Sequence, residues 1–216
     1  MKLRTTLKKL LTAFAPLIIA ASCASPPKLP MTSELKPSPP DEDLPGYSAV
    51  SDEGVYDNAA LRISARHLKS NDAVYAKGES GFLTALIEGD YVLIRLSIEN
   101  KSSAAKVIFN PAYVALMDNA ANYKKPLDYT DLYDIVKEND ETGGKLTGIK
   151  GRIFDLTATV APGGKTSKLL IFKPFIEEAS SAELVIKNIY VGKDTVNVKF
   201  PFKVKTVEKK YTEKKD

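Results

Sequence analysis

The chain of 216 residues contains one cysteine, one histidine and no tryptophan. One cysteine excludes an intrachain disulfide framework, and one cysteine with one histidine excludes a Cys/His zinc site built within a single chain. The same scarcity excludes most chemistry that relies on a cysteine–histidine pair. The lack of tryptophan counts against a sugar-stacking module. We therefore expect no metal and no cofactor.

The net charge of +4 comes from 31 Lys+Arg and 27 Asp+Glu, but it is unevenly placed. Residues 1–22 hold four basic residues and no acid, so the remaining chain carries no net charge. Such a chain does not bind polyanions through bulk charge, and no nucleic acid is expected as a partner. Within it, residues 203–216 carry +3 and residues 23–202 carry −3.

Residues 1–22 read as an export signal. Met1–Lys9 is basic, and Leu10–Ala21 is an apolar run of 12 residues that contains Pro16. A membrane-spanning helix needs about 20 apolar residues, so this run is too short to span a bilayer. A basic segment, a short apolar run and small residues are typical of a secretory signal.

The small residues Ala20, Ala21 and Ser22 directly precede Cys23, the one cysteine of the chain. This arrangement resembles a bacterial lipoprotein precursor. The resemblance implies that the signal is removed and that Cys23 is acylated and attaches the protein to the lipid bilayer. Because Ala24 rather than Asp follows, it also implies the outer membrane, with the protein facing the periplasm or the cell surface.

Seven of the 13 prolines lie between residues 24 and 46. Proline fixes φ and removes a backbone donor, so we predict that residues 23–46 form a semi-rigid tether outside any strand ladder. Such a tether would hold the domain up to roughly 60–70 Å from the bilayer. The acidic run at residues 41–43 is read as solvated linker charge. Residues 47–207 then form one domain, and residues 208–216 a charged tail.

Two-residue alternation of apolar and polar side chains dominates the domain. It predicts strands at residues 61–66, 92–99, 114–116, 154–160, 168–172, 183–191 and 195–204, with turns at 118–119 and 162–164 and a hairpin turn at 192–194. Short strands separated by turn residues favour an all-β fold, an immunoglobulin-like antiparallel β-sandwich.

One stretch departs from this alternation. Pro126–Glu138 has Leu132, Ile135 and Val136 at helical spacing, with acidic residues early and Lys137 late. This order suits the helix dipole and predicts one short inserted helix. We expect a flexible glycine-rich loop to follow it, over residues 141–151.

Three stretches carry a recurring structural pattern. Tyr91–Ser103 reads as a strand, an Asn and a polar turn; Asn110–Asp118 with Asn122 and Tyr123 reads as a loop, a strand, an Asp, a turn and a Tyr; Leu156–Pro174 contains a Pro-Gly-Gly turn before a strand. Together they resemble the telokin-like, immunoglobulin-like domains of unknown function that recur in secreted bacterial lipoproteins. The resemblance implies a fold and carries no catalytic residue.

Three motifs suggest chemistry that their context opposes. Gly163-Gly164-Lys165-Thr166 ends like a phosphate loop, but the required earlier glycine is replaced by Thr159 and a strand follows. Residues 78–81 are one residue short of a nucleophile elbow and are predicted as a loop. His67 continues the face of a strand, which favours a half-buried residue at the strand end over a general base.

Two clusters surround the predicted helix. Asp128, Asp131 and Asp134, with Asn139 and Asp140, are read as a solvated acidic helix start rather than a cation site, because the spacing of a calcium loop is absent. The second cluster consists of candidate partner-binding residues, which alternatively pack at the rim of the sandwich: Tyr113, Tyr123, Tyr129 and Tyr133.

The sequence contains no catalytic constellation, so we expect a protein without enzymatic activity. The favoured interpretation is an outer-membrane-anchored lipoprotein that presents an interaction module to an unknown envelope protein or polymer. The alternative is a structural accessory lipoprotein of a secretion or surface-appendage assembly. Co-purification as a stoichiometric multi-subunit complex would favour the alternative.

Overall fold

The structure, a computed structural model, describes residues 31–40, 42–69, 81–137, 146, 149–176 and 179–208. The predicted export signal and the anchor residue Cys23 lie outside these ranges. So do residues 78–80 of the elbow-like motif, Asn139 and Asp140 beside the helix, and residues 209–216 of the predicted tail.

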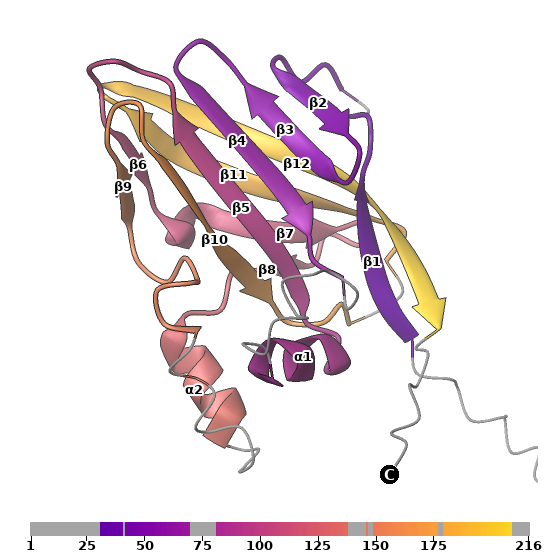
Figure 1. The fold of residues 1–216 in the computed structure, drawn as a ribbon. Coiled ribbons are helices and arrows are strands. Elements are labelled where there is room, and N and C mark those ends of the chain that lie inside the picture. Colours follow the sequence, from indigo (N-terminus) through magenta and orange to yellow (C-terminus); the bar gives the residue numbers. More distant parts are fainter. Residues whose placement is uncertain are drawn as a thin grey trace, which may run out of the picture.

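Two antiparallel sheets pack face to face (Figure 1). The seven-stranded sheet has the order β1 (Met31–Pro37), β12 (Asp194–Glu208), β11 (Ser181–Val191), β6 (Val107–Phe109) and β9 (Ala158–Val160), with β7 (Val114–Asp118) also paired to β11 and β8 (Tyr123–Lys124) paired to β7. The five-stranded sheet has the order β10 (Lys165–Phe172), β5 (Val92–Asn100), β4 (Leu61–His67), β3 (Glu53–Asp57) and β2 (Tyr47–Val50). The predicted all-β antiparallel sandwich is confirmed.

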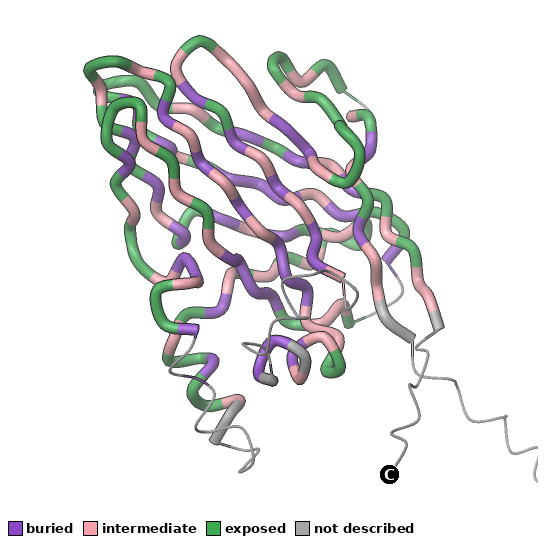
Figure 2. Tube along the Cα trace, viewed as in Figure 1, coloured by how far each residue is buried: buried purple, intermediate pink, exposed green. Residues whose placement is uncertain are grey.

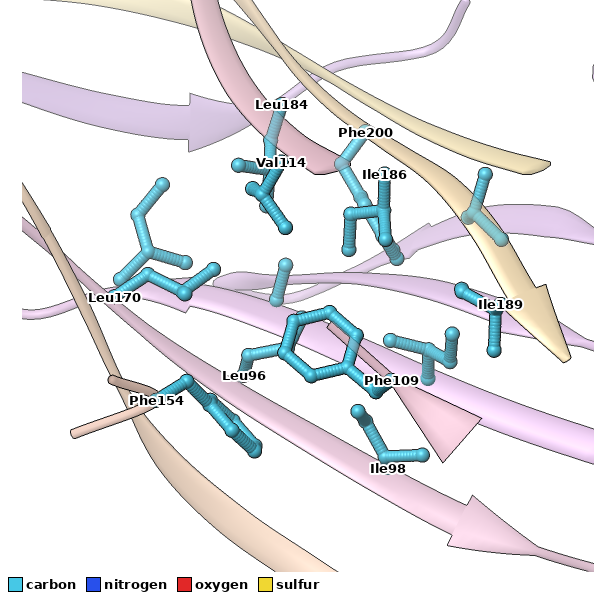
Figure 3. Close-up of a cluster of buried hydrophobic side chains, with 14 of the residues drawn as sticks. Leu96, Ile98, Phe109, Val114, Phe154, Leu170, Leu184, Ile186, Ile189 and Phe200 are labelled. Atoms are coloured by element: carbon cyan, nitrogen blue, oxygen red, sulfur yellow. The ribbon is translucent and has the colours of Figure 1, made fainter. Parts of the chain in front are cut away.

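The main core lies between the sheets. Figure 2 shows buried residues alternating with partly buried ones along the central strands, as one buried and one open face require. In Figure 3, Leu96 and Ile98 of β5 face Leu184 and Ile186 of β11 across this core. The alternation that predicted the strands therefore reflects the packing of two inner faces.

A second apolar cluster lies on the outer face of the five-stranded sheet. Leu93 of β5 and Leu169 and Ile171 of β10 point outward, yet each is at most 6% exposed. They are covered by α1 (Gly81–Glu88), by α2 (Tyr129–Lys137) and by Leu146, Ile149 and Ile153. Strands that are buried on both faces lose their clean alternation, and the unbroken apolar run at residues 169–172 reflects this.

The elements that cover the second cluster correct two predictions made from the sequence. The predicted helix is confirmed as α2, but α1 is a second helix that the sequence analysis missed. The expectation of a flexible loop at 141–151 is wrong at Leu146 and Ile149, two described residues of the stretch, which are each 3% exposed and belong to the second cluster. These two side chains complete the cover over β5 and β10.

The tether prediction is wrong for residues 31–37. They form β1, which pairs with β12 from Met31↔Glu208 to Pro37↔Phe202 and buries Leu35 to 2% exposure. Residues 31–36 contain no proline, and Pro37 stands at the end of an edge strand, where a missing donor is tolerated. The described fold therefore begins at Met31, and its last strand runs to Glu208.

His67 joins the two sheets. Its Nδ1 accepts a hydrogen bond of 3.3 Å from the backbone N–H of Leu35, which belongs to β1 of the other sheet. The ring is 7% exposed, more buried than the half-buried position that the sequence predicts. At the end of β4, His67 is thus a buried residue that accepts a hydrogen bond from a backbone N–H of the edge strand β1.

The predicted strand over residues 154–160 is shorter than expected, because only Ala158–Val160 form β9. The preceding segment is attached to the other sheet, where the N–H of Phe154 donates to the Leu169 carbonyl at 2.9 Å. The chain crosses between sheets at residues 155–157, and Leu156 is left 75% exposed.

Asn100 fastens the end of β5. Its buried side-chain amide donates to the carbonyls of Ala105, Val160 and Ala161 at 2.8 to 3.0 Å, and its oxygen accepts from Ser102 N–H at 3.0 Å. One side chain therefore satisfies a turn and the end of β9 in the opposite sheet. This is the Asn that follows the strand in the family-like pattern.

Asn100→Asp replaces the donating amide by oxygens that face three carbonyls. We expect a loss of about 2–4 kcal/mol in the free energy of unfolding. The three carbonyls would lose their hydrogen-bond donor, and the new carboxylate charge would be buried without a cationic partner. Urea unfolding measures the loss. Asn119→Asp is the matched control, since Asn119 uses its side-chain oxygen to accept from Ser180 N–H and the change keeps that acceptor. Equal stability of the two variants would contradict the assignment.

Leu146→Ala tests whether the glycine-rich stretch is part of the fold. We expect the free energy of unfolding to fall by about 2–4 kcal/mol, as for other leucines removed from a core. Leu156→Ala, at a side chain 75% exposed, should change it by less than about 0.5 kcal/mol. A neutral Leu146→Ala in thermal or urea unfolding would show that the second cluster does not depend on residue 146.

Candidate functional site

A groove of about 660 Å³ lies where β10 ends and α2 begins. Both helices lie at this end of the sandwich (Figure 1). Three chain segments form the groove: β8 with the residues that lead to α2, the first turn of α2, and the segment that follows β10. Its lining comprises Tyr123, Lys124, Lys125, Pro126, Leu127, Asp131, Lys173, Pro174, Phe175 and Ile176.

The β7–β8 hairpin forms one wall. Asp118 Oδ1 accepts from the backbone N–H groups of Ala120 and Asn122 at 3.0 and 2.9 Å, which closes the turn. The turn then aligns Met117 with Tyr123 and Leu116 with Lys124. The predicted turn at 118–119 is confirmed, and it places Tyr123 and Lys124 at the groove.

Leu127 fixes the floor of the groove to the five-stranded sheet. Its N–H donates to the Ile171 carbonyl at 2.7 Å, and its side chain is 5% exposed within the second cluster. The segment between β8 and α2 is thereby held against the end of β10. The residues that follow β10, from Lys173 to Ile176, supply the opposite wall.

A reciprocal cap starts α2. Asp128 Oδ1 accepts from the N–H groups of Thr130 and Asp131 at 2.8 and 2.9 Å, and Asp131 Oδ2 accepts from Asp128 N–H at 3.1 Å. This is the arrangement of a capping box. Two of the three aspartates considered for a cation therefore bind backbone groups, as a helix start requires, and the described residues contain no cluster of three metal-ligating side chains.

The groove combines positive charge with apolar surface. Its described lining residues include three lysines and one aspartate, and the Lys124 ammonium lies 5.7 Å from the centre of the Phe175 ring. Within the described ranges, no ion pair engages Lys124, Lys125 or Lys173. Ile176 and Tyr123 are 79% and 66% exposed. Such a surface suits an anionic partner with an apolar part.

The structure does not gather the four tyrosines at this site. Tyr123 lines the groove, whereas Tyr129 packs against the second cluster with the Lys150 ammonium 5.9 Å from its ring centre. Tyr113 ends the short 3-10 helix Pro111–Tyr113 and Tyr133 lies on α2, 47% and 53% exposed. Rim packing thus accounts for Tyr129, and the partner-binding role of the others stays a prediction.

Sequence reasoning missed the lysines and the wall that follows β10. Lys173, Phe175 and Ile176 follow a buried strand without any periodic pattern, so no local signal in the sequence marks them as part of a surface. The rejection of the phosphate loop is confirmed, because Thr159 lies in β9 and residues 165–172 form β10.

Comparisons with known proteins add little. No family model matches the chain, and no curated protein does. The chain is similar to the yjhA protein of Bacillus subtilis, a solved structure, with 14% sequence identity over 67% of this chain and 93% of that one, at a TM-score of 0.39. Among the described helices, none is long and apolar enough to cross a membrane.

Asp128→Ala removes the cap that orients the α2 wall of the groove. We expect the free energy of unfolding to fall by about 0.5–2 kcal/mol, the usual effect of losing such a cap. Asp134→Ala is the control, since Asp134 is exposed and lies beyond the first turn. Thermal unfolding followed by circular dichroism measures both, and a larger loss for Asp134→Ala would contradict the capping box.

Proposed function

We propose that this protein is a lipid-anchored, non-enzymatic interaction module of the bacterial cell envelope, attached to the outer membrane through acylated Cys23. The observation that carries the proposal is the position of Cys23, the one cysteine of the chain, directly after a basic segment, a short apolar run and small residues. Acyl chains contribute about 0.8 kcal/mol for each buried CH₂, and more than one chain gives stable anchoring.

The groove supports a role in binding. It displays apolar side chains and lysines without ion-pair partners in the described part of the chain, on a rigid sandwich whose turns and helix start are well hydrogen-bonded. Exposed apolar residues beside charged ones are typical of interaction surfaces. The groove is therefore the surface that we assign to the module's partner.

Cys23→Ser tests the anchor. We expect the variant to lack acylation, to keep its signal segment or to be released, and to disappear from the detergent-extracted lipoprotein fraction, because serine offers no thiol for lipid attachment. Mass spectrometry of the N-terminal peptide and membrane fractionation measure this. Ala24→Ser, which leaves the cysteine in place, should remain acylated. An acylated or normally anchored Cys23→Ser protein would overturn the proposal.

A further inference from the structure

We propose that the groove face docks on the anionic phospholipid surface to which the chain is anchored, so that the domain rests on the bilayer instead of standing away from it. This inference rests on the lipid anchor of the proposed function and adds the partner of the groove. It follows from the length of the tether, from the end of the sandwich where the chain enters, and from the chemistry of that end.

The tether is far shorter than the prolines suggest. Because β1 begins at Met31, only residues 24–30 separate the folded domain from Cys23. A chain spans at most about 3.6 Å per residue in any conformation, so eight residue steps reach at most roughly 29 Å. The distance of roughly 60–70 Å between the domain and the bilayer, expected for a tether without strands, is therefore too long.

The chain enters the domain at the end that carries the groove. Figure 1 shows the start of β1 at the same end of the sandwich as α1 and α2. The strand pairings also place β1 near the end of β10. His67 binds Leu35 of β1 and lies opposite Ile94 of β5. Two residues along β5, Val92 lies opposite Phe172, the last residue of β10. The wall from Lys173 to Ile176 directly follows Phe172. A short tether attached here keeps this end near the bilayer.

The chemistry of that end suits an anionic interface. Among the described residues that line the groove, Lys124, Lys125 and Lys173 outnumber one acid, Asp131. Lysines near a membrane surface are attracted by anionic headgroups, and this attraction acts within about 8–10 Å at physiological salt. Tyr123 and Ile176 are exposed beside them and can enter the boundary between headgroups and acyl chains.

The test uses the acylated full chain reconstituted into phosphatidylcholine vesicles with or without phosphatidylglycerol. Acylation blocks Cys23, so an introduced cysteine is the only free thiol and can carry an environment-sensitive fluorophore. Thr130→Cys places the label in the first turn of α2 beside the groove, and Ser103→Cys places it in the turn beyond the other end of β5. Quenching by spin-labelled lipids reports which label lies at the membrane.

We expect the label at residue 130 to be quenched several-fold more than the label at residue 103, and only when phosphatidylglycerol is present. Lys124→Gln, Lys125→Gln and Lys173→Gln together should lower the ratio of docked to free domain by about tenfold or more. The control removes the same charge at the opposite end of the sandwich: Lys106→Gln, Lys165→Gln and Lys193→Gln. The control variant should keep the wild-type quenching.

Other outcomes overturn the inference. Equal quenching of both labels, or quenching that ignores phosphatidylglycerol and the groove lysines, would show that this face does not dock on lipid. Protection of the label at 130 in native envelopes but not in protein-free vesicles would assign the groove to a protein. Absence of acyl chains in the mass spectrum would instead refute the anchor itself, which separates failure of the proposed function from failure of this inference.

Discussion

The burial of β5 and β10 on both faces is the constraint on which the rest of the structure depends. Their inner residues fill the space between the sheets, and their outer residues Leu93, Leu169 and Ile171 cannot face water without a large free-energy cost. A third, partial layer of two helices must therefore cover one end of the five-stranded sheet. The chain that leads into α2 is held to Ile171 by a backbone hydrogen bond, and this attachment creates the groove.

Much of the sandwich could be predicted from the sequence because most strands have one buried and one open face. Alternation located β4, β5, β11 and most of β12, and the turn residues located the β7–β8 and β11–β12 hairpins. The prediction failed where another interaction outweighed the local signal. Prolines around β1 concealed a strand that an edge position tolerates. The strand predicted at residues 168–172 is confirmed as most of β10, although burial on both faces removes its alternation.

The groove was harder to predict than the fold. Tyr123 was a candidate from sequence because tyrosines cluster near the insertion, yet the lysines and Phe175 come from segments about fifty residues apart. Only the tertiary pairing of β7 with β8 and the hydrogen bond from Leu127 to the end of β10 bring them together. No local pattern records such long-range contacts, whereas the capping residues Asp128 and Asp131 could be read from the helix start.

The contact between His67 and Leu35 has a consequence for a protein confined to a surface. A lipid anchor would concentrate many copies in two dimensions, where free strand edges meet often and can join into aggregates. β1 is an edge strand, and the imidazole engages one of its outward-facing donors, so a neighbouring copy finds that part of the ladder already occupied. On such a surface, the single histidine would help to keep crowded copies apart.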